Sequence, residues 1–113
     1  MVRPVINFDT PTVRVPRAGR RRGKDTITAH LFSTIPGPAG TAELIAFAKS
    51  IGFRERWIQD RGTHREHFDL IGEGPIKRAR EAGAKEVTIR AFGKVLRSKR
   101  AFYSAIKQAQ KQT

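Results

Sequence analysis

The segment HREHFDL (residues 64–70) gathers histidine and carboxylate side chains within a few positions. His67 and Asp69 are two residues apart in it, while His30 and Asp9 belong to earlier apolar segments. Imidazole titrates near neutral pH and a carboxylate orients it, so this combination suits general acid–base catalysis or a divalent-metal site. The spacing matches no established catalytic signature. The alternative is that the segment is only a polar turn whose Phe68 side chain packs into the core.

Short apolar segments and helical patterns alternate along the chain and must position these groups. β-Branched and aromatic runs bounded by Gly, Pro or Asp predict strands, and apolar residues three or four apart predict helices. Thr41 is expected to cap the first helix, after a Pro- and Gly-rich break, and Gly52 to end it. The expected strands are 5–9, 27–33, 56–59 and 86–90, and the expected helices are 41–52, 74–82 and 91–110.

This order predicts an α/β fold, a small two-layer or three-layer sandwich with a short, largely parallel sheet and a basic amphipathic C-terminal helix. In a parallel sheet, ligands collect at the carboxyl ends of the strands, where Asp9, His30 and the 64–70 segment are expected. A shared site requires His30 and His67 within about 10 Å, the reach of one bridging water.

The backbone alternation of an extended strand makes a finer prediction for this segment. If Phe68 points into the core, its neighbours His67 and Asp69 both point outward. His64 lies further from them and is expected to point to solvent.

The length of 113 residues predicts one domain, 1–113. The absence of Cys excludes disulfides, thiolate metal sites and a cysteine nucleophile. The sequence shows no signal-peptide pattern and no apolar run of membrane-spanning length. We therefore expect a cytoplasmic protein that makes no membrane contact.

The net charge of +13 is concentrated toward both ends. Residues 1–40 carry 7 basic and 2 acidic side chains, 41–90 carry 10 and 8, and 91–113 carry 6 and none. We expect a basic Pro/Gly/Arg-rich loop or arm over 10–26, poorly ordered over 16–24, and a basic helix and tail over 91–113, both suited to phosphate. The expected nucleic-acid contacts are Arg17, Arg20, Arg21, Arg22, Lys24, Lys94, Arg97, Arg100 and Lys107.

Three functions remain open at this point. A nucleic-acid-binding accessory protein is favoured, because the chain lacks a complete catalytic signature. A small hydrolase or nuclease-like enzyme would use Asp9, His30, His67 and Asp69; its cofactor is left open, and a divalent metal is one option. A module for an acidic protein partner is the third. Trp57 and its neighbouring arginines offer stacking surfaces for bases, although a Trp in a predicted strand is expected in the core.

The segments AHLFS, AELIAFAKSIG, RWIQ, HFDL and VTIR follow one another between about Val5 and Leu96. This order resembles the small bacterial and phage proteins of the domain of unknown function 4031 family, which has no established activity. In that family the first strand usually ends in paired acids and the histidine strand ends in Ser-Asp. This chain has Asp9-Thr10 and Ser33-Thr34 there, and a longer, more cationic loop. If those acids bind a metal, the resemblance implies that part of the set is missing here. The most specific shared pieces are His30-Leu31, Glu43-Leu44, Phe47-Ala48, Gly52, the aromatic of HFD and Gly83-Ala84.

Overall fold

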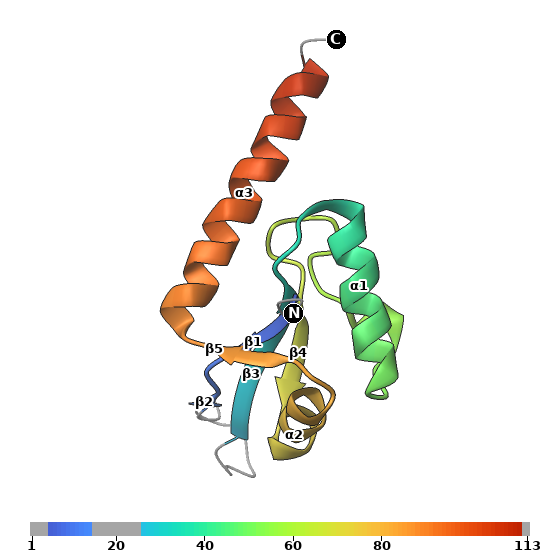
Figure 1. Ribbon diagram of the computed structural model, residues 1–113, viewed down its shortest axis with the longest axis vertical. Helices are drawn as coiled ribbons and strands as arrows, with labels where there is room; N and C mark the ends of the chain where they lie inside the picture. Colours follow the sequence, from blue (N-terminus) through green and yellow to red (C-terminus); the bar gives the residue numbers. More distant parts are fainter. Residues whose placement is uncertain (1–4, 15–25, 112–113) are drawn as a thin grey trace, which may run out of the picture.

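The computed structural model describes residues 5–14 and 26–111, in which a small sheet is combined with three α-helices (Figure 1). The expected α/β class and C-terminal helix are confirmed. The elements are β1 (Ile6–Asp9), β2 (Thr12–Arg14), β3 (Thr26–Ser33), α1 (Gly37–Ser50), a 3₁₀ turn η1 (Glu55–Trp57), β4 (Phe68–Ile71), α2 (Glu73–Glu81), β5 (Lys85–Val87) and α3 (Ile89–Lys111).

The five-stranded sheet is mixed. β3 is antiparallel to β1, β2 and β4, and only β1 and β5 are parallel. The expectation of a largely parallel sheet is therefore wrong. Alternating strands and helices predict parallel crossovers, but the chain runs along the sheet once more between α1 and β4, so β4 enters from the opposite end (Figure 1).

β1 and β2 lie on the same side of β3, with a shift of one residue between them. Phe8 is opposite Leu31, and Thr12 is opposite Thr28, so β1–β2 contains one residue more than the matching part of β3. This is the pattern of a β-bulge, a feature common beside active sites. The expected arm over 10–26 is thus wrong for β2, whereas the arginines and lysine expected in it lie outside the described residues.

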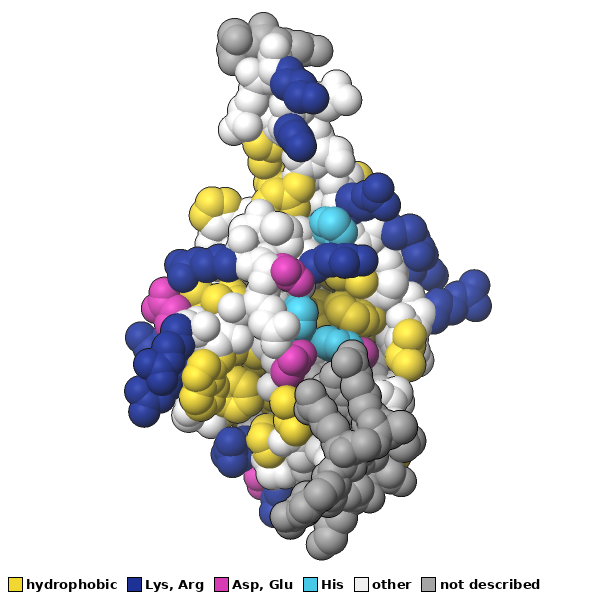
Figure 2. Space-filling view, turned by 180° about the vertical axis from the view of Figure 1, so that it is seen from behind, with side chains coloured by type: hydrophobic (Ala, Val, Ile, Leu, Met, Phe, Trp, Pro, Cys, Tyr) yellow, Lys and Arg dark blue, Asp and Glu magenta, His cyan; other side chains and the backbone are white. Residues whose placement is uncertain are grey.

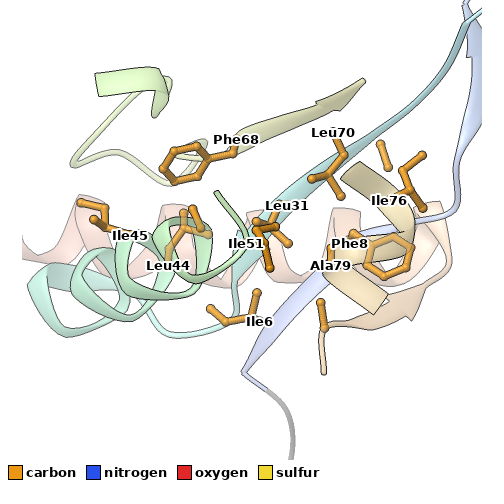
Figure 3. Close-up of a cluster of buried hydrophobic side chains, with 13 residues drawn as sticks. Ile6, Phe8, Leu31, Leu44, Ile45, Ile51, Phe68, Leu70, Ile76 and Ala79 are labelled. Atoms are coloured by element: carbon orange, nitrogen blue, oxygen red, sulfur yellow. The ribbon is translucent and has the colours of Figure 1, made fainter. Parts of the chain in front are cut away.

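The core fills the space between one face of the sheet and helices α1 and α2 (Figure 3). Phe8, Leu31 and Phe68 are opposite one another on β1, β3 and β4, and all three are fully buried. Leu44 of α1 and Ile76 of α2 cover this row. Because side chains alternate along a strand, the next row across the same three strands must face the other side of the sheet.

Three expected element boundaries are wrong. α1 begins at Gly37 rather than 41, because proline is well tolerated in the first helical turn and Pro38 is therefore part of the helix. The expected strand at 56–59 is instead η1, which leaves Trp57 46% exposed rather than in the core. The expected strand 86–90 stops at Val87, since the Thr88 hydroxyl accepts a hydrogen bond from the Ala91 N–H and so caps α3.

The first half of α3 packs on the second face of the sheet, and its second half extends beyond the sheet (Figure 1). Lys99 is the one buried residue of α3, and its Nζ donates a hydrogen bond to the Ser33 carbonyl at 3.0 Å. Burial lowers the pKa of Lys99, and the buried carboxylate of Glu66 opposes this effect. Further along, the Tyr103 hydroxyl accepts a hydrogen bond from the Gly37 N–H.

Four further cations of α3 are exposed, as expected from the sequence. We call them the α3 basic face: Lys94, Arg97, Arg100 and Lys107.

None of the helices in the described part of the chain has the length and apolar character of a membrane span.

Candidate metal centre

The candidate site occupies the row of residues next to the buried one, on the face of the sheet that α3 partly covers. His30 of β3 is directly opposite Asp69 of β4, and Asp9 ends β1 on the other side of His30. Directly opposite side chains of antiparallel strands have Cβ atoms about 4.5–5.5 Å apart, so the register alone brings an imidazole between two carboxylates. Figure 2 shows histidine and acidic side chains together near the centre of this face.

The carboxylate of Asp9 holds His30 through two hydrogen bonds. Its Oδ2 atom is 3.0 Å from Nδ1 of His30, and its Oδ1 atom accepts the His30 backbone N–H at 2.6 Å. The Asp9 contact raises the pKa of His30, partial burial opposes the rise, and the negative charge of Asp69 adds to it. With Nδ1–H donated to Asp9, the Nε2 atom of a neutral His30 ring keeps its lone pair.

His67 shows the same arrangement with a different partner. Its Nδ1 atom is 2.6 Å from the Arg65 carbonyl oxygen, which can only accept, so Nδ1 carries a proton. Its Nε2 atom is 3.2 Å from Oδ1 of Asp69. The other oxygen of Asp69 accepts a hydrogen bond from the Gln59 amide at 2.6 Å, and the backbones of Gln59 and His67 are paired. The Arg65 carbonyl therefore fixes the His67 ring, and the Gln59 amide fixes the Asp69 carboxylate.

The two imidazole rings lie close together in an edge-to-face arrangement. Their centroids are 5.2 Å apart and their planes are inclined by 74°, which meets the geometric condition for a shared site. The Phe92 ring of α3 stacks on the His30 ring, with the ring centroids 5.7 Å apart, and so covers one side of the site. As expected, Phe68 is fully buried while its two neighbours reach this outer face. The catalytic roles of these residues remain a prediction.

His64 does not join the cluster. It lines a separate hollow with Tyr103 and Ile106 of α3 and is partly buried rather than fully open to solvent. Burial, together with the positive charge of Arg65, lowers the pKa of His64. Two further residues of the site were not among the expected site residues. Gln59 was expected only as a strand end close to the 64–70 segment, and Phe92 only as part of an apolar helical stripe.

The donor atoms fit a divalent metal ion. One ligand atom from each of His30, His67 and Asp69 lies within 4.8 Å of the others. Two ligands about 2.0–2.1 Å from a zinc ion at a tetrahedral angle are about 3.3 Å apart, close to the 3.2 Å between His67 and Asp69. The chemistry of the set is two imidazoles and a carboxylate, with Asp9 orienting one imidazole.

The site opens into a pocket of about 400 Å³. Its remaining walls come from the bulged β1–β2 region, β3 and the end of β4: Thr12, Val13, Thr28, Ala29 and Ile71. The pocket is large enough for a small ligand to reach the cluster, which three protein donors alone would leave with an open coordination position.

A family model described as "Protein of unknown function (DUF4031)" matches residues 14–99. The chain belongs to this family. The DUF4031 match contains the three converging residues His30, His67 and Asp69, whereas Asp9 and the projecting end of α3 fall outside it. No curated protein and no solved structure matches the chain. The family description states no activity, so the chemistry must be argued from the site.

Proposed function

We propose that this protein is a divalent-metal-dependent hydrolase of phosphate esters, with nucleic acid as its substrate class. One observation carries the proposal. The Nε2 atom of His67 and Oδ1 of Asp69 are 3.2 Å apart, although the Nδ1 atom of that ring already donates to a carbonyl. A lone pair facing a carboxylate at this distance is unfavourable unless a proton or a metal cation lies between them. The neighbouring His30 offers a second imidazole to the same point.

The residues divide into holding and orienting groups. His30, His67 and Asp69 would hold the metal, while Asp9 and Gln59 fix the orientation of two of these ligands through their hydrogen bonds. A divalent metal held by these three residues would supply a nucleophile at neutral pH by lowering the pKa of water. Phe92 restricts the approach of solvent to the His30 ring.

The charge distribution supports a phosphate-ester substrate. α3, which contacts the site through Phe92, carries basic residues and no acidic ones. Positive potential around a polar site raises the local concentration of a polyanion and its rate of association. The positions of several basic side chains next to the histidine and acidic cluster are visible in Figure 2.

Metal binding tests the holding residues directly. Zinc affinity would be measured by calorimetry on the full chain, for the wild type and for His67→Ala, Asp69→Asn and Asp9→Asn. We expect the two ligand variants to lose most of the affinity, and Asp9→Asn to weaken it about 10- to 100-fold, as for other groups that orient a ligand. His64→Ala is the matched control, because it removes a nearby histidine outside the cluster and should leave the affinity unchanged.

Turnover tests the reaction class. Cleavage of single-stranded and duplex oligonucleotides, DNA and RNA, would be followed with zinc and with manganese, and with a chelator added. We expect metal-dependent cleavage that His67→Ala abolishes and His64→Ala retains. The proposal is wrong if the wild type binds no metal, or if His67→Ala and His64→Ala bind and cleave alike.

A second candidate function is nucleic-acid binding without cleavage, favoured by the α3 basic face. Its four cations are all exposed, and no acidic residue interrupts them along the helix. Changing three of them to Glu (Arg97, Arg100 and Lys107) should weaken binding to all sequences alike and flatten its salt dependence, because such contacts address phosphates. Unchanged anisotropy with a labelled oligonucleotide would show that this side of α3 is only a solvated surface.

A further inference from the structure

A second pocket lies directly beside the candidate metal centre. Its volume is about 410 Å³, and it shares Gln59, Asp69 and Ile71 with the pocket over the histidines. The two pockets are therefore neighbours, and Asp69, a proposed metal ligand, also lines the second pocket. The other residues that line it are Gly52, Phe53, Trp57, Phe68, Pro75 and Arg78.

Aromatic side chains give this second pocket a rigid floor. Trp57 packs edge-to-face on Phe53, with ring centroids 5.6 Å apart, and Phe53 packs in the same way on the buried Phe68 at 5.9 Å. The indole is held through Phe53 to the core, yet 46% of Trp57 is exposed, and so is 53% of Ile71. An ordered Trp beside an apolar residue, both open to solvent within a hollow, is typical of a ligand site.

Polar groups around these aromatic rings could form hydrogen bonds with a planar ligand. The amide nitrogen of Gln59 donates to Asp69, so its amide oxygen is left as an acceptor at the boundary between the pockets. Arg78 donates its Nε–H to the Ile51 carbonyl, which fixes the side chain and leaves the terminal nitrogens of the guanidinium for another partner. Arg54, which precedes the turn that carries Trp57, and Arg56, which lies within it, are both exposed.

We propose that the second pocket binds a nucleobase, and that the phosphate of the same nucleotide lies at the metal centre. The inference rests on the proposed function, because it names which part of the substrate each pocket holds. A base stacks on an exposed indole whatever its sequence, while arginines beside it neutralise the phosphates. Free nucleotides and nucleotides within a single strand share this chemistry. A duplex would not enter, since its bases are stacked and paired with each other.

The fluorescence of Trp57 reports on this pocket alone, because the chain contains one Trp. We would titrate metal-free protein with the four nucleoside 5′-monophosphates, with ribose 5-phosphate and with short single-stranded oligonucleotides. Quenching by the nucleotides and not by ribose 5-phosphate is expected. Tighter binding of the oligonucleotides would identify a strand as the source of the base, and equal affinity would identify a free nucleotide.

Substitution of the indole gives a second readout. Trp57→Ala should weaken binding of a labelled single strand, measured by anisotropy, by about tenfold, the usual contribution of one base–aromatic stack. Trp57→Phe should retain most of the affinity. Phe102→Ala is the matched control, since it removes an exposed aromatic of α3 outside both pockets and should change nothing. The Trp57 effect should persist when salt is raised, unlike the effect of the basic face.

The outcomes separate this inference from the proposed function. It is overturned if no nucleotide quenches Trp57, if ribose 5-phosphate quenches equally, or if Trp57→Ala binds like Phe102→Ala. Quenching by nucleotides in a protein that binds no metal would keep the base pocket and reject the hydrolase. Metal-dependent cleavage with full activity in Trp57→Ala would keep the hydrolase and reject the base pocket.

Discussion

The buried lysine of α3, Lys99, should contribute strongly to the stability of the fold by holding α3 against the rest of the protein. Lys99 is 2% exposed and donates to the Ser33 carbonyl at 3.0 Å, and the carboxylate of Glu66, 1% exposed, lies in the same buried region. We predict that Lys99→Met destabilises the fold, although methionine fills a similar volume and is an equally good helix former. The change leaves the Ser33 carbonyl without its donor and Glu66 without a nearby cation.

The expected loss follows from these two groups. A buried carbonyl without a donor costs about 1–3 kcal/mol, and a buried carboxylate that loses the attraction of a nearby buried cation adds to this loss. Removing the lysine also recovers part of its own desolvation, so we expect a net loss of about 2–4 kcal/mol. With about 2.1 cal/mol/K of unfolding entropy per residue, this lowers Tm by about 8–16 °C in a chain of this length.

Urea and thermal unfolding followed by circular dichroism would measure the loss. Lys94→Met is the control on the same helix, because Lys94 is exposed and its replacement should change stability by no more than about 0.5 kcal/mol. Adding Glu66→Gln to Lys99→Met should cost less than the sum of the single changes, since the amide carries no stranded charge. A Lys99→Met protein as stable as the wild type would refute the reasoning.

The pH dependence of the free energy of unfolding gives the sign of the electrostatic contribution of Lys99. Burial lowers the pKa of Lys99 below its ordinary 10.5, so at alkaline pH the unfolded chain binds more protons than the folded one. This contribution therefore makes the wild type more stable as pH rises toward 10.5, and Lys99→Met lacks it. The stability difference between the two proteins should widen with pH. A difference that narrows would show that the ammonium is not desolvated.

Three further predictions follow from the sheet and its site. In metal-free protein, Asp9→Asn should lower the pKa of His30 in an NMR titration. Because the folded pKa is raised, the contact stabilises the fold most below pH 6.5, and this stabilisation is lost as pH rises through the raised value, so an unchanged midpoint would count against the pairing. Phe68→Ala should cost about 3–5 kcal/mol in urea unfolding, while the exposed Ile71→Ala should cost far less. Zinc at about 100 times its Kd should raise Tm by about 11 °C, and Asp69→Asn should remove this rise.

Local patterns in the sequence were sufficient for most elements and for the facing of the site residues. Alternation around Phe68 placed both of its neighbours on one side, because a strand leaves no other choice. Which strands pair with each other depends on residues that are far apart in the sequence, so local patterns do not predict the pairing. The four candidate residues were expected to meet at the ends of parallel strands, but Asp9, His30 and Asp69 meet because antiparallel register puts them in one row.

Two residues show different limits of the sequence interpretation: no burial was predicted for Lys99, and the core position predicted for Trp57 was wrong. Lys99 lies on the apolar stripe of α3, four residues before Tyr103, so its helical position indicated burial even though its charge did not. Trp57 carried no such signal. A single aromatic in a four-residue segment has no period, and the exposure of its indole depends on a 3₁₀ turn that the sequence did not reveal.

The row that crosses β1, β3 and β4 also divides the proposed metal ligands along the chain. The part of the chain that ends with α1 contains Asp9 and His30, whose side chains are paired. It contains neither His67 nor Asp69, so it supplies one of the three proposed metal ligands. The other two come with β4 and the residue before it, and β4 also completes the buried row. A product truncated before His67 would therefore lack both the proposed metal centre and part of the core.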